Sequence, residues 1–291
     1  MSISTEDIKL LRESTGAGVL DCKKALQETD GNIDEAIEFL RKKGLAAASK
    51  KASREANDGK VSAQVSDDSK VGVMVKVNCE TDFVARTDDF QTFVDSLVRQ
   101  MFDQPELTSV EALLAAPYID DSNTTVGGKL TEIIAKLGEN TIIREAVRFD
   151  LDGDGMIENY VHMAGRVGVL VEVGGGNPRN EKFVELVHDL ALQIAASSPQ
   201  YVAETDVPPA AVESEKNIYR AQLAEDKKPD NIKERIIDGK LKKWYSEVVL
   251  LDQEFVKDTN LTIAQLVEKY SKELGSQLKI RRFARFELGA S

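Results

Sequence analysis

Cysteine, histidine and proline are scarce in this sequence, and long apolar runs are missing. Two of the 291 residues are cysteines and two are histidines. Cys22 and Cys79 lie far from each other and from both histidines, which disfavours a disulfide framework and a zinc site. The longest strongly apolar stretches, such as residues 167–173, are too short to span a bilayer. We therefore expect reduced cysteines, no metal or cofactor, and no membrane segment.

An excess of positive charge is also missing. The chain has 50 acidic and 38 basic residues and a formal charge of −12. Because phosphate binding requires a concentrated basic face, we expect no direct contact with nucleic acid. The length predicts about two compact units and a small module. The first residues lack the basic start and apolar core of a signal peptide, so we expect a cytoplasmic location.

The N-terminal residues predict a small helical module. Apolar positions recur at helical spacing in three short segments within residues 3–44. Asn32 is placed to cap the third helix and Gly44 to end it. Residues 45–57 are small, polar and basic, as in a tether. We expect a three-helix module with its tether over residues 1–54, whose small core suits it to presenting a surface.

The rest of the chain repeats itself. Residues 58–77 align without gaps with residues 154–173, and eight of the twenty positions are identical. Each copy reads as an antiparallel hairpin, followed by a helix over 90–102 in one copy and 181–197 in the other. The fold class is therefore α+β, with two duplicated subdomains that contain antiparallel sheets. We place these core subdomains at residues 55–149 and 150–291.

The copies differ where the strand leads into the helix. When Phe93 is matched with Phe183, the first copy carries six extra residues within 78–86. The second copy has Gly174–Pro178 instead, a loop with nothing to display.

A helical hairpin interrupts the second copy at about residues 209–245, where two short amphipathic segments follow each other. Self-association through this hairpin and packing on its own subdomain both remain open. The remaining residues predict a strand, a helix opened by the capping pair Thr262 and Gln265, and a last strand through Leu288 that completes the second sheet.

Several patterns imitate ligand sites without completing them. Residues 150–155 resemble the start of an EF-hand loop, but Val161 stands where its bidentate glutamate belongs, so we interpret them as an acidic hairpin turn. Gly174–Gly176 lacks the lysine that follows in a P-loop. Three arginines near the C-terminus have little aromatic interleaving and fit a partly solvated strand edge; they are Arg281, Arg282 and Arg285.

No catalytic constellation remains, because neither His162 nor His188 has a serine or cysteine nucleophile in a familiar arrangement. We expect a protein that is not an enzyme. Two interpretations of Phe83, in the segment Thr81–Val84, remain open. It is either a core residue at the start of a helix or a residue displayed on the surface. The second repeat folds without this segment, which favours display.

Two long motifs resemble those of the bacterial elongation factor Ts family. They are Leu11–Leu26 and Val77–Arg86, and shorter matches occur at 138–140, 162–171 and 194–197. The resemblance covers nearly the whole chain. It implies a ubiquitin-associated-like N-terminal module and a guanine-nucleotide exchange factor for elongation factor Tu. Such a factor binds the GDP-bound partner, promotes GDP release and stabilises the nucleotide-free form until GTP binds.

The resemblance also implies roles for individual residues. The stretch Thr81, Asp82, Phe83 and Val84 would dislodge the partner's magnesium, with Phe83 as the wedge. Other residues would dock on the partner: Arg12, Val19 and Leu20 from the N-terminal face, and His162 from the second subdomain. Some relatives continue into a C-terminal helical module, whose contacts we expect to be absent here.

Two rival functions come from other classes. One is a scaffold whose three-helix module binds ubiquitin-like or other helical partners. The other is an enzyme that uses Gly174–Gly176 to hold a phosphorylated ligand.

Overall fold

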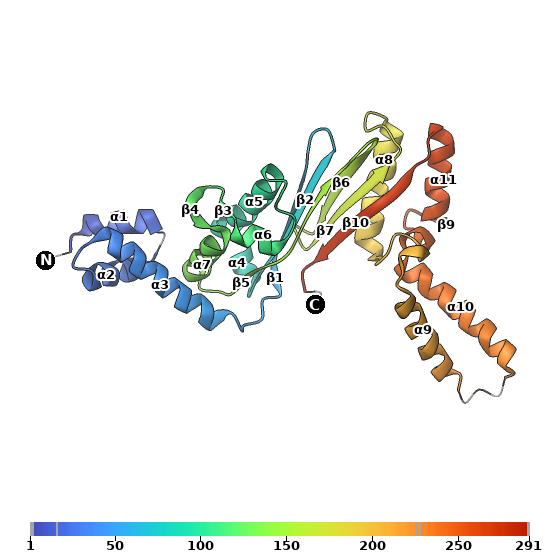
Figure 1. Ribbon diagram of the computed structural model, residues 1–291, viewed down its shortest axis with the longest axis horizontal. Helices are drawn as coiled ribbons and strands as arrows, with labels where there is room; N and C mark the ends of the chain where they lie inside the picture. The colour runs from blue at the N-terminus through green and yellow to red at the C-terminus, as the bar shows by residue number, and fades with distance from the viewer. Residues whose placement is uncertain (1–2, 16, 225, 227, 290–291) are drawn as a thin grey trace.

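The computed structural model describes residues 3–15, 17–224, 226 and 228–289. The chain forms an elongated molecule with the N-terminal helices at one end, two sheets in the middle and a helical hairpin at the other end (Figure 1). Gly16 of the first motif and Lys227 in the hairpin connection lie outside the described residues.

The N-terminal module contains α1 (Thr5–Thr15), α2 (Val19–Glu28) and α3 (Ile33–Lys51). The side chain of Asn32 caps α3 by accepting hydrogen bonds from two backbone N–H groups, as expected. The prediction that Gly44 ends this helix is wrong, because α3 continues to Lys51 and includes part of the expected tether. A Cβ on Gly44 would lie 3.6 Å from Ala135 Cβ, an ordinary contact distance, so Gly44 lies where α3 packs against a helix of the core.

The first core repeat contains one three-stranded antiparallel sheet and the helices that cover it. The sheet has the order β1-β2-β5. In chain order, the elements are β1 (Asp58–Val65), β2 (Val71–Cys79), α4 (Asp82–Ala85), α5 (Asp88–Asp103), α6 (Val110–Ala115), β3 (Pro117–Tyr118), β4 (Asp121–Thr125), α7 (Val126–Leu137) and β5 (Thr141–Asp150).

The second core repeat has the same plan with the helical hairpin inserted. Its sheet has the order β10-β7-β6. The elements are β6 (Gly155–His162), β7 (Val167–Gly174), α8 (Glu181–Ser197), η1 (Glu204–Asp206), α9 (Pro209–Gln222), α10 (Asp230–Val248), η2 (Leu250–Asp252), β8 (Glu254–Phe255), β9 (Asp258–Thr262), α11 (Ile263–Leu274) and β10 (Lys279–Glu287). The mixed α+β class is confirmed.

The duplication extends further than the hairpins and helices that predicted it. The segment β3–β4–α7–β5 recurs as β8–β9–α11–β10. Equivalent side chains bind this segment to the helix that follows the hairpin, α5 or α8. Gln100 donates to the Pro117 carbonyl at 2.7 Å, and Gln193 donates to the Glu254 carbonyl at 3.1 Å. The predicted capping box of Thr262 and Gln265 opens α11.

The same equivalence corrects the size of the insertion. Gln100 and Gln193 are 93 residues apart, as are the helix caps Thr87 and Asn180, whereas the hairpins are 96 apart. The first repeat therefore carries three extra residues before its helix, not six. Phe90, rather than Phe93, is the residue equivalent to Phe183.

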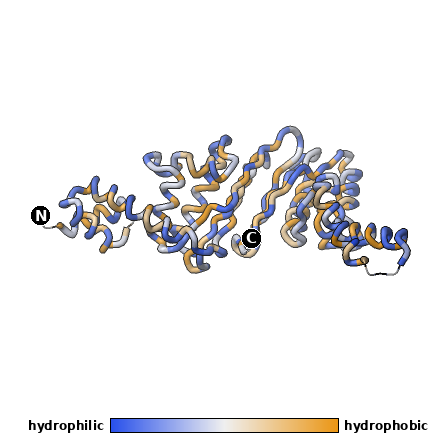
Figure 2. Tube along the Cα trace, turned by 60° about the horizontal axis from the view of Figure 1, so that its bottom comes forward, coloured by the Kyte–Doolittle hydropathy of each residue, from blue (hydrophilic) through white to orange (hydrophobic). Residues whose placement is uncertain are grey.

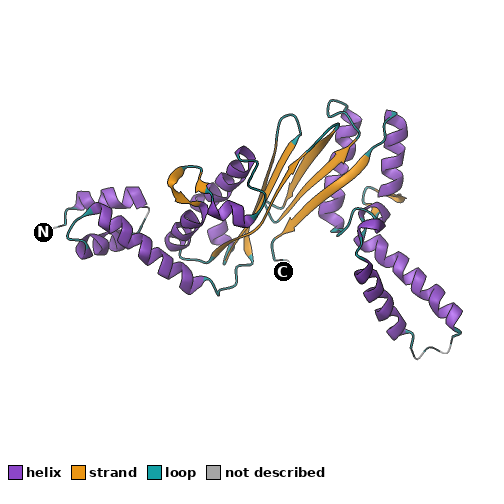
Figure 3. Cartoon of the chain, viewed as in Figure 1, coloured by secondary structure: helices purple, strands orange, loops and turns teal. Residues whose placement is uncertain are grey.

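The core is layered as helices, sheet, sheet, helices (Figure 3). In β2, Val73, Val75 and Val77 pack in the core under α5, whereas Met74 packs between the sheets. Strand β7 follows the same alternation, with Leu170 facing the other sheet. Both faces of each strand are buried, which explains the continuous valine-rich runs. Figure 2 shows that hydrophobic residues are frequent along the strands in the middle of the molecule.

The two hairpins pack against each other reciprocally. The N–H of Val61 donates to the Gly165 carbonyl at 2.7 Å, and the N–H of Ile157 donates to the Ser69 carbonyl at 2.8 Å. Val61 and Ile157 are 96 residues apart, as are Ser69 and Gly165, so the two hydrogen bonds are equivalent. Each hairpin turn therefore lies against the first strand of the other repeat. The core thus has two equivalent ends. Residues 151–154 connect the two sheets, so the expected hairpin turn there is wrong.

The helical hairpin of α9 and α10 projects from the second repeat, and its two helices contact each other (Figure 1). Ile237 and Leu241 of α10 are buried, and Ile218 of α9 is the exposed large apolar residue of this pair. Self-association through the hairpin stays a prediction. Among the described residues, no helix is long and apolar enough to cross a membrane.

Candidate functional site

One helical turn, α4, lies where the first repeat carries its extra residues. Thr81 caps it, because its side chain accepts a hydrogen bond from the N–H of Val84. The Phe83 side chain is 80% exposed. The core interpretation of Phe83 is therefore wrong, and we call residues 80–86 the Phe83 turn.

The backbone of the Phe83 turn is fixed at both ends although its central side chain is free. On one side, Glu139 accepts two hydrogen bonds from Thr81. On the other side, Ala85 is buried and its carbonyl accepts a hydrogen bond of 2.5 Å from the Gln91 amide. A rigid turn therefore presents an aromatic ring that has little packing of its own.

An ion pair and a thiol hydrogen bond also stabilise the Phe83 turn. Asp82 forms an ion pair of 2.9 Å with Arg86 one turn later. The buried Cys79 thiol lies 3.1 Å from the Thr81 carbonyl and donates to it. Burial, followed by the nearby carboxylates of Glu139 and Asp58, raises the pKa of Cys79 to about 12, so this thiol stays protonated.

The turn between β6 and β7 lies at the same end of the core. Its Gly165 bonds to β1, and Arg166 lies 3.7 Å from Asp58 at the start of that strand. Asp58 is paired with Cys79, the residue that leads into the Phe83 turn. We call the region formed by residues 161–166 and the Phe83 turn the Phe83 end.

His162 and Met163 are both exposed in this second turn. The hydroxyl of Tyr160 lies 2.8 Å from His162 Nδ1, and the two rings are stacked. Met163 is 67% exposed and has a positive φ of 49°. Sequence reasoning named His162 but missed Met163. Comparison of the repeats could have identified Met163, because the matched residue 96 positions earlier is the charged Asp67.

The opposite end of the core combines the Gly174–Pro178 loop with the turn Ser66–Ser69, and we call it the glycine end. Glycine is required at two positions of this loop because neighbouring atoms leave no space for a Cβ. Gly175 has φ of 86°, and a Cβ there would overlap the backbone of Gln277. A Cβ on Gly176 would overlap the Phe183 ring. These glycines therefore let the loop pack closely against Gln277 and Phe183.

The predicted docking residues of the N-terminal module are exposed. Arg12 and Val19 line a shallow depression that also includes Lys136 of α7. Leu20 is 81% exposed. Leu10 is also exposed, and it was not named as a surface residue from the sequence.

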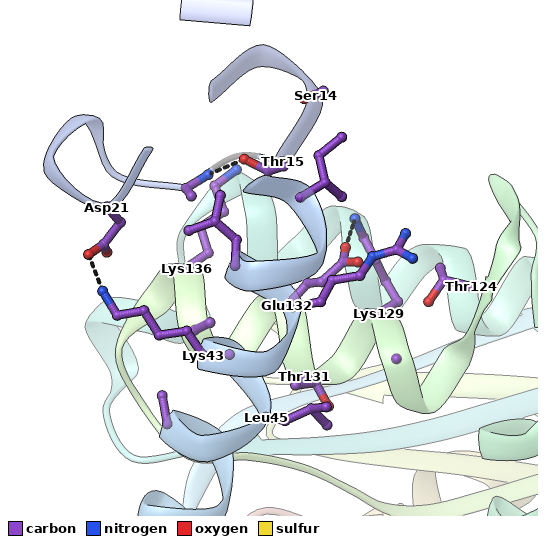
Figure 4. A pocket seen from close by; sticks show the side chains of 18 of the residues that line it. Ser14, Thr15, Asp21, Lys43, Leu45, Thr124, Lys129, Thr131, Glu132 and Lys136 are labelled. Carbon is purple, nitrogen blue, oxygen red and sulfur yellow. Dashed lines mark hydrogen bonds and ion pairs between the residues drawn. The ribbon is translucent and has the colours of Figure 1, made fainter. Parts of the chain in front are cut away.

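A cavity of about 460 Å³ lies beside the contact between α3 and α7, lined by residues of the module and of α7. Figure 4 shows Lys43 paired with Asp21, and Lys129 paired with Glu132, on its lining. These partners neutralise much of the charge that faces the cavity. The module thus contacts the core through a partly hollow interface.

The other groups considered in the sequence have structural partners. His188 lies 3.5 Å from Glu158. Buried Glu172 pairs with Arg281 at 3.2 Å and with Arg282 at 2.7 Å, so these arginines stabilise a carboxylate of the core. Within the described ranges, no group of three or more His, Cys, Asp or Glu side chains is placed to hold a metal ion.

Comparison with known proteins adds a family to this geometry. A family model described as "Elongation factor TS" matches residues 80–290. The chain is 45% identical over 292 residues to elongation factor Ts of Trichlorobacter lovleyi and 46% identical over 287 residues to that of Clostridium novyi. It is 44% identical over 289 residues to that of Halothermothrix orenii. Each alignment covers 99% of this chain and 93% of the relative.

Proposed function

The chain belongs to the elongation factor Ts family, and from this premise we propose that it is a guanine-nucleotide exchange factor for elongation factor Tu. The observation that carries the proposal is Phe83, an 80% exposed aromatic residue on a turn whose backbone is held at both ends. In this role, Thr81–Val84 enter the partner near its nucleotide and dislodge the bound magnesium.

Exchange of this kind needs no catalytic residue, because no covalent bond breaks. The factor binds the nucleotide-free partner more tightly than the GDP-bound partner. Linkage makes the effect reciprocal, so bound GDP weakens the factor's binding by the same ratio. The factor then stabilises the empty partner until GTP binds.

The wedge alone cannot supply the required free energy. A thousandfold faster release needs about 4 kcal/mol, whereas burying one phenylalanine provides about 1.5–3 kcal/mol. Other contacts must supply the difference. The exposed residues Arg12, Val19 and Leu20 of the module and His162 of the second repeat are our candidates for these docking contacts.

The domain division belongs to the same proposal. The module with its tether (1–54) and the second subdomain (150–291) act as docking units, and the first subdomain (55–149) carries the wedge.

The direct test is release of a fluorescent GDP analogue from purified elongation factor Tu, measured with and without this protein. We expect release to accelerate with the concentration of the factor and to saturate. If stoichiometric and higher concentrations left the rate unchanged while the two proteins still bound each other, a scaffold function would replace exchange. Binding of the analogue to this protein alone would favour the phosphate-ligand enzyme.

A further inference from the structure

The Phe83 turn is anchored by a carboxylate that is distant in sequence. Glu139 follows Gly138, the left-handed residue that ends α7. Its Oε2 accepts from the N–H of Thr81 at 3.0 Å, and its Oε1 accepts from the Thr81 hydroxyl at 2.7 Å. Both carboxylate oxygens therefore act on one residue, and charge-assisted bonds of this kind are stronger than neutral ones.

This anchor controls the direction of Phe83. The exposed ring has little packing to hold it, so its position depends on the backbone of α4. Thr81 begins that helical turn as its cap. A change at Thr81 is thus transmitted to Phe83 two residues later.

The neighbouring residues connect the same two segments a second time. The N–H of Asn140 donates to Glu80 Oε1 at 2.6 Å, next to the Glu139–Thr81 pair. The Asn140 side chain donates to the Arg54 carbonyl at 2.8 Å. The segment after α7 therefore holds the Phe83 turn and the end of the tether together.

The second repeat uses the equivalent position in another way. Gly275 ends α11 as Gly138 ends α7, so Ser276 is the counterpart of Glu139. Its hydroxyl donates to the Gly175 carbonyl in the glycine-rich loop. Both repeats anchor the connection from strand to helix at this position. The carboxylate, with two accepting oxygens, occurs in the repeat that displays Phe83.

We propose that Glu139 is a positioning residue for nucleotide exchange, which holds Thr81 so that Phe83 enters the partner in one orientation. The proposal rests on the proposed exchange function. Glu139 acts through Thr81 and need not touch the partner.

The first test compares Glu139→Ala with Glu139→Gln in the GDP-release assay. We expect Glu139→Ala to lower the rate at saturating factor about tenfold and to change the half-saturating concentration less than twofold, because the docking surfaces are intact. Glu139→Gln keeps one accepting oxygen and should lower the rate about threefold. The matched control is Glu111→Ala, which removes an exposed glutamate from α6 of the same subdomain.

A double-mutant cycle with Phe83→Ala separates positioning from general damage. If Glu139 acts through Phe83, Glu139→Ala should have no further effect on release in the Phe83→Ala background. Equal losses in both backgrounds would overturn the proposal, as would wild-type rates for Glu139→Ala. Thermal melts of each variant show which molecules are folded under the assay conditions.

Hydrogen exchange gives a readout that does not depend on the partner. The hydrogen-bonded amides of residue 81 and residues 84–86 should lose protection in folded Glu139→Ala and keep it in Glu111→Ala. Unchanged protection in Glu139→Ala would overturn the anchor. If the wild-type protein failed to accelerate GDP release, the exchange function would fail, and the protection data would still decide whether Glu139 holds the turn.

Discussion

The Phe83 end and the glycine end of the core have the same scaffold and different surfaces. Each consists of a strand-to-helix connection from one repeat and a hairpin turn from the other. The Phe83 end displays an aromatic ring and Met163, both largely exposed. The glycine end has a crowded glycine loop and the acidic turn Ser66–Ser69. The duplicated fold thus provides two equivalent positions, and local residues decide which of them is available to a partner.

Electrostatics sharpen this contrast. At the glycine end, the hydroxyl of Ser66 and the backbone N–H of Lys70 bond to Asp68 and lower its pKa, so its carboxylate stays ionised. At the Phe83 end, the residue equivalent to Asp68 is Ala164, which has no charge. The acidic turn Ser66–Ser69 favours water, whereas the equivalent residues 162–165 contain no Asp, Glu, Lys or Arg and include an exposed methionine, which favours an apolar partner surface.

The largest expected effect comes from removing the ring that distinguishes the two ends. Phe83→Ala should slow GDP release by the factor about 10–100-fold, equivalent to about 1.4–2.7 kcal/mol. Its melting temperature should barely change, because no core cavity is created; a buried phenylalanine would cost about 3–5 kcal/mol. Fluorescent-GDP release and a thermal melt measure the two quantities. Arg179→Ala in the equivalent connection is the control, and an equal loss there would remove the distinction between the ends.

Substitution of the glycines between the two sheets tests whether the sheets are closely packed. A Cβ on Gly168 would overlap Val61 and lie 2.8 Å from Met74 Sδ, and one on Gly72 would lie 2.7 Å from Ile157 Cγ2. Gly168→Ala should destabilise the protein by about 2 kcal/mol and Gly72→Ala by about 1 kcal/mol. Urea unfolding measures both.

The control for these glycines is Gly239→Ala on α10, where a Cβ has open space. It should stabilise the protein by about 0.5–1 kcal/mol through helix propensity. If Gly168→Ala raised the free energy of unfolding as Gly239→Ala is expected to do, the two sheets would not be closely packed at Gly168.

A smaller effect is expected from making the two hairpin turns alike. Met163→Asp places at the Phe83 end the residue type that Asp67 provides at the glycine end. We expect docking on elongation factor Tu to weaken about tenfold, since a charge replaces an apolar contact. Titration calorimetry with the nucleotide-free partner measures this change. Asp67→Ala should leave affinity unchanged, and the opposite ranking would assign docking to the glycine end.

The smallest effect is expected at the ion pair beside the ring. Asp82→Ala removes the partner of Arg86, an exposed pair of the kind worth about 0.3–0.5 kcal/mol. GDP release should slow about twofold to threefold. Because neighbouring residues enter one site, Asp82→Ala combined with Phe83→Ala should be little worse than Phe83→Ala alone. Fully multiplicative rate losses would show that the two side chains act separately.

Much of the local structure was predictable because it depends on short-range patterns. Apolar spacing located most of the helices, but not α6 or α7. β-branched alternation located both hairpins, and residue chemistry identified the caps at Asn32 and Thr262. Comparison of the repeats also predicted that Phe83 is displayed. The alignment failed at the helix, where Phe93 was matched with Phe183, because both Phe90 and Phe93 lie one turn apart on the same buried face.

The functional surface was less predictable because it depends on contacts between distant segments. Gly44 has the residue type of a helix end, yet it lies inside α3, where α7 approaches it. Met163 faces solvent because its turn packs against β1 of the other repeat through Gly165. Nothing in the local sequence of either residue indicates its neighbour.

By itself, the sequence determined most of the helices, the duplicated hairpins, the family and the residues that distinguish one repeat from the other. These properties follow from periodicity, turn chemistry and identity at matched positions, all of which are readable along the chain. Only the tertiary structure decided that the Phe83 turn and the His162 turn share one end of the core, and that Glu139 anchors Thr81. The physical reason is that a hydrogen bond between residues 58 positions apart depends on how sheets and helices pack, which no local pattern specifies.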